Sequence, residues 1–170
     1  TLDSTLLPSA PIWHSIATKE QYIYVLGGKE ENPGSANAVV NKVYLGIIDT
    51  NGVITSWTAV TPLPKPLALG VATVVGDRLY FAGGLENQSV YWAPINNDGT
   101  LGSWTEAGLL PEELNGLGMI EHNNHLIIVG GRNVSNDNSQ KTYKAAINND
   151  GSLSAWREEI YAKLTNARPI

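Results

Sequence analysis

The chain has 170 residues, of which 42% are hydrophobic and 16% charged, a composition typical of one globular domain rather than a disordered segment. The formal net charge is −5 and no basic run is present, which excludes nucleic acid as an expected partner. No cysteine is present, which excludes disulfides, thiolate nucleophiles and cysteine-based metal sites. No apolar run reaches the roughly 18 residues that a membrane span needs, so we expect no membrane insertion.

Glycine doublets close short apolar runs three times along the chain. The runs 22–26, 79–82 and 126–129 end at Gly27-Gly28, Gly83-Gly84 and Gly130-Gly131. Each doublet begins 19 residues after the proline of a Leu-Pro pair, at Pro8, Pro64 and Pro111. Seventeen Gly and nine Pro, with five Trp and seven Tyr against one Phe, favour short strands joined by tight turns.

A tyrosine and a tryptophan follow each doublet at a fixed offset. The tyrosine precedes the tryptophan by 13 residues in all three copies, which are Tyr44 and Trp57, Tyr91 and Trp104, and Tyr143 and Trp156. Between them fall Asn51-Gly52, Asp98-Gly99 and Asp150-Gly151, dipeptides preferred in tight hairpins because glycine accepts a positive φ. A residue needed once per unit indicates packing between units, so we interpret the three tryptophans as structural.

These spacings define a repeating unit of four short strands. The first strand follows the Leu-Pro, the second ends at the doublet, the third carries the tyrosine and the fourth carries the tryptophan. Four strands in an up-and-down meander make one blade of a β-propeller. We therefore predict an all-β propeller segment over residues 1–170, with blades at about 8–62, 63–109 and 110–162.

The doublet after an apolar strand, then the tyrosine, then the tryptophan resemble the kelch repeat, and the resemblance covers nearly the whole chain. The kelch repeat usually has an arginine early in the first strand, and here Pro11, Leu67 and Leu114 stand in its place. It also has a small residue or histidine shortly afterwards, a position that only His14 matches, since the other copies have Gly70 and Leu117. This pattern resembles a divergent bacterial type of kelch repeat, for which an extracellular or periplasmic location is favoured.

Three blades leave two unpaired faces, because propellers close with about four to eight blades. Two alternatives stay open: a half-ring whose two copies form a six-bladed ring, or part of a longer propeller whose other blades are missing. Further blades are thus an expected partner in either case. We expect that the 170 residues alone are not a closed monomer.

Loops of unequal length indicate the binding side. Between the doublet and the tyrosine lie 15, 6 and 11 residues, and these loops share one face of the propeller, the loop face, with the connections between blades. The opposite face, the turn face, carries short, equal turns. Insertions on one face of a repeat protein commonly mark its binding side. The candidate binding residues are Trp13, Lys29, Glu30, Glu31, Asn32, Glu86, Asn87, Glu112, Arg132, Asn133 and Asp137.

Trp13 joins this set because it lies outside the repeated tryptophan positions, although packing in the core is the commoner role of such a side chain. We expect Trp13 to lie on the first strand, beside His14.

No catalytic residue, metal site or cofactor is predicted. His14, His122 and His125 are the only histidines, and His122 and His125 flank a turn of the turn face. A galactose-oxidase-like copper site needs a cysteine, and the arginines fall at unrelated phases for a sialidase-like cluster. We therefore favour a non-catalytic module that binds a protein or glycan. The alternative is a sugar-binding or sugar-isomerising enzyme resembling sialic-acid mutarotases, with Arg132 and Glu30 or Glu86 at its site.

Overall fold

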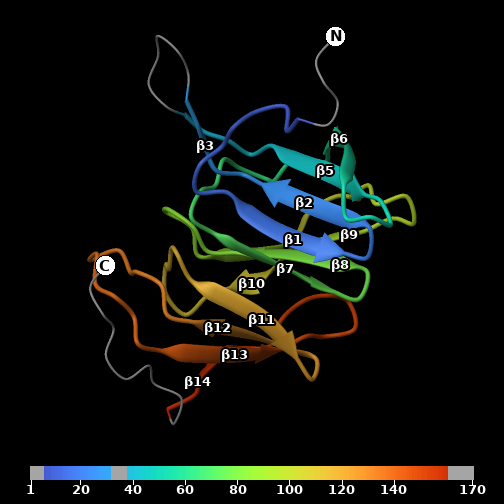
Figure 1. Ribbon diagram of the computed structural model, residues 1–170. Helices are drawn as coiled ribbons and strands as arrows, with labels where there is room; N and C mark the ends of the chain where they lie inside the picture. Colours follow the sequence, from blue (N-terminus) through green and yellow to red (C-terminus); the bar gives the residue numbers. More distant parts are fainter. Residues whose placement is uncertain (1–5, 32–37, 161–170) are drawn as a thin grey trace.

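The structure is a computed structural model that describes residues 6–31 and 38–160. Its strands form three four-stranded antiparallel sheets and one two-stranded ribbon (Figure 1). No helix occurs among the described residues. The predicted class, an all-β propeller segment of three four-stranded units, is confirmed.

In each four-stranded sheet the strands follow one another in chain order, as a meander requires. The first sheet contains β1 (Ser15–Lys19), β2 (Tyr22–Leu26), β5 (Val43–Ile48) and β6 (Ile54–Val60). The second contains β7 (Val71–Val75), β8 (Arg78–Ala82), β9 (Ser89–Pro94) and β10 (Thr105–Leu109). The third contains β11 (Gly118–His122), β12 (His125–Val129), β13 (Thr142–Ala146) and β14 (Arg157–Glu158).

Two details differ from the sequence-based expectation. Trp57 lies within β6, but Trp104 and Trp156 come directly before β10 and β14. The first loop after a doublet also contains a ribbon of its own, formed by β3 (Lys29–Glu30) and β4 (Ala38–Val39). Two residues per strand are too few to leave an alternation pattern in the sequence.

The three sheets stack face to face, with β1 beside β7 and β7 beside β11 (Figure 1). Because side chains alternate across a strand, the middle sheet supplies residues to two cores. Leu79 and Phe81 of β8 join the first sheet's core, whereas Tyr80 and Ala82 face the third sheet. Each core is thus a seam between neighbouring sheets.

The glycine doublet is required by how closely one sheet approaches the next. Gly27 has a φ of 61°, and a Cβ there would stand 2.3 Å from the carbonyl oxygen of Leu67 in the next unit. The N–H of Gly28 donates to that same oxygen at 2.8 Å. Gly84 repeats the contact with the oxygen of Leu114 at 2.9 Å. Only glycine combines this positive φ with so short a backbone contact.

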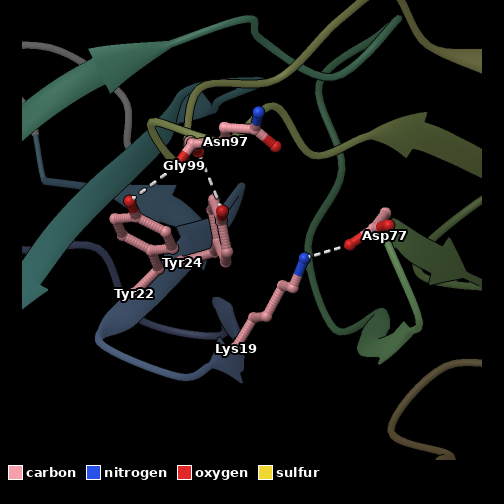
Figure 2. A network of polar contacts seen from close by, with 6 residues as sticks. All are labelled: Lys19, Tyr22, Tyr24, Asp77, Asn97 and Gly99. Carbon is pink, nitrogen blue, oxygen red and sulfur yellow. Dashed lines mark hydrogen bonds and ion pairs between the residues drawn. The ribbon is translucent and has the colours of Figure 1, made fainter.

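A buried tyrosine hydroxyl makes the second recurring contact between sheets. Tyr24 donates to the carbonyl oxygen of Gly99 at 2.8 Å (Figure 2), and Tyr80 donates to that of Gly151 at 2.9 Å. Both acceptors belong to the Asp-Gly hairpin of the next sheet. Burial raises the pKa of both tyrosines, so each keeps the proton that it donates.

Exposed contacts flank this bond on the turn face. Tyr22 donates to the carbonyl oxygen of Asn97 at 3.0 Å, and Lys19 pairs with Asp77 (Figure 2). The Lys19 ammonium lowers the pKa of the Asp77 carboxyl through hydrogen bonding and charge. Since Asp77 is exposed, we assign this pair little stability.

We predict that Tyr24→Phe lowers the free energy of unfolding by about 1–2 kcal/mol, because it leaves the Gly99 oxygen without its donor in a buried place. Tyr22→Phe removes an exposed hydroxyl and is the matched control, with an expected loss below about 1 kcal/mol. Urea unfolding followed by fluorescence measures both. Equal losses for the two variants would contradict the role assigned to the buried bond.

Candidate functional site

Trp13 lies before β1 rather than on it, so its predicted place on the first strand is wrong. Its φ is 59°, and Leu69 and Gly116 hold the same place before the doublet with φ values of 59° and 61°. The three copies therefore share one left-handed backbone position. Glycine adopts it freely, whereas a bulky residue such as tryptophan is strained there.

Backbone hydrogen bonds join these three positions on the loop face. Leu69 N–H donates to the Trp13 oxygen at 2.9 Å, and Gly116 N–H donates to the Leu69 oxygen at 2.7 Å. The left-handed turn is thus imposed by the contacts between blades and not by the residue type. Strain held in this way by surrounding structure is characteristic of functional positions.

Trp13 is 45% exposed and belongs to neither of the two cores, so its interpretation as a core residue is wrong for the described structure. The Lys29 Nζ lies over the ring at 5.0 Å from its centroid, within the range of a cation–π contact. Two backbone hydrogen bonds between Ile12 and Lys29, of 2.9 and 2.7 Å, align the two side chains. Trp13 and Lys29 form an aromatic surface with a positive charge above it.

Glu30 is engaged within its own loop. Its Oε2 accepts a hydrogen bond from Lys42 Nζ at 2.7 Å. Burial acts to raise the pKa of this carboxyl, but the hydrogen bonds from Lys42 and Ser9 hold it below its usual value. Glu31 is exposed beside it, and Asn32 lies outside the described residues.

A cavity of about 300 Å³ opens on the loop face where the second and third blades meet. Its walls come from the loop after Gly84 and from both loop-face segments of the third blade. The lining residues are Gly84, Leu85, Glu86, Glu113, Asn115, Asn133, Val134 and Asn136. Two carboxylates and three amides supply polar groups, while Leu85 and Val134, 39% and 77% exposed, supply apolar ones.

The predicted residues of the third loop are brought together beside this cavity. The Arg132 Nη1 donates to Asn136 Oδ1 at 3.1 Å, and its guanidinium is exposed. Asn133 Oδ1 accepts the Asp137 N–H at 2.9 Å, which fixes the turn and leaves the Asp137 carboxylate exposed. The side chain of Arg132 is therefore held by neutral amides and keeps its charge uncompensated by a carboxylate in the described structure.

Asn87 is buried and bonded to the backbone of its own loop. It is 1% exposed, and its amide donates to the carbonyl oxygens of Gly83 at 2.8 Å and Ser89 at 2.9 Å. These bonds shape the short loop of the second blade. We therefore leave Asn87 out of the proposed binding surface and keep Glu86, which lines the cavity.

Glu112 accepts two hydrogen bonds within the third blade. Tyr143 donates its hydroxyl to Glu112 Oε1 at 2.6 Å, and Lys141 lies 3.2 Å from the same oxygen. Hydrogen bonds to Tyr143 and to Glu112 raise the pKa of Lys141. A second cavity of about 320 Å³ adjoins this group and is lined by Glu112, Asn133, Asn138, Ser139, Gln140, Lys141 and Glu158.

The described residues show no group of three histidine, aspartate or glutamate side chains that could hold a metal ion. Nor does the described part of the chain contain a helix long and apolar enough to cross a membrane. His14 Nδ1 contacts the Pro11 oxygen at 2.8 Å, and His122 and His125 are part of the β11–β12 hairpin.

Sequence reasoning did not single out Leu85, Val134 and Asn136, which line the cavity, whereas Glu113 and Asn115 belong to the segment 112–115 that it expected on the loop face. Asn115 belongs to a connection that the sequence places on the loop face, so its position was predictable. Its pairing with Arg132 through backbone bonds of 3.0 and 2.8 Å was not, because those bonds join segments of irregular backbone.

The chain was compared with families, curated proteins and solved structures. No family model matches the chain. Kelch-like protein 34 of Homo sapiens is 30% identical over 141 residues, or 75% of this chain and 21% of that protein. Kelch-like protein 41 of Rattus norvegicus is 24% identical over 120 residues, or 69% of this chain and 19% of that protein. The chain thus spans about a fifth of the length of these curated relatives.

Among solved structures, the chain is similar to the "Structure of YjhT", with a TM-score of 0.68 and 16% identity. The match covers 88% of this chain and 46% of that chain. The stacked four-stranded meanders define a β-propeller repeat protein. The chain belongs to the kelch-repeat family.

We predict that Trp13→Gly changes the free energy of unfolding by less than about 1 kcal/mol, because relief of the left-handed strain offsets the lost contact with Lys29. Trp104→Ala is the control. It removes a partly buried side chain that packs against the core and whose Nε1 donates to the Thr61 oxygen at 3.2 Å, and it should cost about 3 kcal/mol. Chemical denaturation measures both. A loss for Trp13→Gly as large as for Trp104→Ala would show that Trp13 is structural.

Proposed function

We propose that the chain is a non-catalytic kelch module that binds a protein or glycan through its loop face. The observation that carries the proposal is the exposed Trp13, which occupies a strained position where the third blade has glycine. Trp13 strains the backbone and does not pack in a core, so stability does not explain why tryptophan stands there. A role in binding does.

The chemistry of the loop face supports an uncharged or mildly acidic polar ligand with some apolar surface. Trp13 offers a flat ring on which a sugar or a side chain can stack, and Lys29 and Arg132 offer positive charge. The amides of Asn115, Asn133 and Asn136 can donate to hydroxyl or peptide oxygens. Peptides and glycans both present these groups.

A second candidate function is sugar binding with isomerisation, as in the mutarotase-like alternative. The observation in its favour is that Arg132 and Glu86 belong to neighbouring loops around one cavity region, so a cation and a carboxylate flank a space of ligand size. This candidate needs further blades to complete the site. We rank it second because Arg132 is not part of the cavity wall, whose charged residues among those described are the carboxylates Glu86 and Glu113.

We also infer that further propeller blades are partners of this chain, since a ring of four-stranded blades needs more than three to close. Kelch propellers generally mediate protein interactions. A bacterial and exported origin stays a prediction from the repeat pattern.

The binding proposal predicts that Trp13→Ala and Val134→Asp each weaken capture of ligands by at least tenfold. The probes are a printed glycan array and a displayed random-peptide library, with hits measured again by calorimetry. His122→Ala, an exposed change on the turn face, is the control and should keep wild-type affinity. Hits that survive both loop-face changes would contradict the proposed surface. Mutarotation of sugars by the wild-type chain, lost in Arg132→Ala, would favour the enzyme instead.

A further inference from the structure

The outer face of the first sheet exposes positions that are buried in the other two sheets. Ile16, Ala72 and Met119 hold the same place in the repeat, counted back from the doublet. Ala72 and Met119 are each 8% exposed because a preceding sheet covers them, whereas Ile16 is 50% exposed. Val25 and Tyr44 share this face with Ile16 but are buried, and Ser9 donates to the Tyr44 hydroxyl at 3.4 Å. The part of the face around Ile16 has no described sheet over it.

The outer face of the third sheet exposes the complementary positions. Strand register sets Ile120, Ile127 and Lys144 in one row, equivalent to the row Ala17, Tyr24 and Leu45 of the first sheet. Ala17 and Tyr24 are 7% and 0% exposed beneath the second sheet, but Ile120 is 57% exposed. The outer faces of the first and third sheets therefore carry the two sides of the contact that joins neighbouring sheets within the chain.

The backbone shows the same incompleteness. Gly28 and Gly84 donate to the next blade, yet no acceptor for the Gly131 N–H is found among the described residues. Gly116, the last of the three left-handed positions, likewise has no described donor for its carbonyl oxygen. At both junctions between sheets within the chain, the second glycine of the doublet has an acceptor and the left-handed position has a donor. A further junction of the same kind would satisfy Gly131 and Gly116.

We propose that a second copy of this chain covers both faces, with β11–β13 of each copy against β1 and β2 of the other. The Gly131 N–H then reaches the carbonyl oxygen at Pro11 of the second copy, the position equivalent to Leu67 and Leu114. The Gly116 oxygen accepts from the N–H of the second copy's Trp13. A two-fold axis satisfies both junctions at once and closes a ring of six sheets.

Charge and size favour a second copy as the occupant. Two cations, Lys144 and Arg157, and one carboxylate, Glu159, line a cavity of about 430 Å³ on the outer third sheet. The facing hairpin of the first sheet carries the half-buried Asp49, whose pKa is lowered by backbone hydrogen bonds from Val53 and Asn51. The solved propeller that this chain resembles is about twice as long, since the match covers 46% of it.

One contact of the regular junction is missing in this pairing. Ile127 stands where Tyr24 and Tyr80 donate to a hairpin glycine, so the Gly52 oxygen of the second copy receives no hydroxyl. The junction between copies is therefore weaker than the two junctions within the chain. This difference provides a way to strengthen the pair by substitution. The pairing does not rest on the proposed ligand surface.

The first test is the mass of the folded chain by light scattering across a dilution series. We expect twice the mass of one chain, and a single-chain mass for Ile16→Asp and Ile120→Asp with an unchanged circular dichroism spectrum. Val134→Asp, which places the same charge at a residue 77% exposed on the loop face, should stay paired. A folded monomer of the wild-type chain, or an open series of larger species, would overturn the proposal.

The second test adds the missing hydroxyl. Ile127→Tyr should pair about fivefold more tightly than Ile127→Phe, because only the tyrosine can donate to the Gly52 oxygen. Sedimentation equilibrium measures both dissociation constants, and the phenylalanine variant controls for ring size. Equal affinities of the two variants would refute the predicted contact between Ile127 and the second copy's hairpin.

Discussion

The structure depends on a backbone contact between neighbouring sheets, in which the second glycine of a doublet donates to the first segment of the next blade. Gly28 and Gly84 make this bond, and the buried hydroxyls of Tyr24 and Tyr80 add a second bond at the turn face. The two bonds hold each sheet at both of its ends. They set the spacing within which the cores between sheets pack.

The sequence predicted the meander, the strand ends near each doublet and the hairpins. It could do so because glycine is required where the backbone has a positive φ and approaches another backbone closely, as at Gly27. Those glycines therefore mark the strand ends and turns in the sequence. The tyrosines that bridge sheets were not singled out. Tyr24 lies in an apolar run, where periodicity shows burial but not the partner of its hydroxyl, which belongs to the hairpin of another blade. The β3–β4 ribbon was missed because it is too short to leave a pattern.

The candidate site, which stays a prediction, was inferred from the sequence as a face of the propeller rather than as a set of contacts. Unequal loop lengths selected the loop face, and Arg132, Asn133 and Glu86 do lie at or beside one cavity. The sequence predicted Trp13 on a strand, but contacts between blades impose a left-handed backbone conformation on this residue. Asn87 looked like an exposed loop residue, but its amide fits two backbone carbonyls within its own loop. These hydrogen-bond partners are set by which segments lie close together in the folded chain. The local sequence around a residue does not show them.

Amide hydrogen exchange of single glycines tests the account of the sheet contacts most directly. In the Ile120→Asp chain, the N–H groups of Gly28 and Gly84 are bonded across sheets and should exchange slowly, whereas the N–H of Gly131 should exchange rapidly. Residue-resolved exchange by nuclear magnetic resonance separates the three. If Gly28 and Gly84 exchange as fast as Gly131, the contact on which the structure is argued to depend is absent in solution.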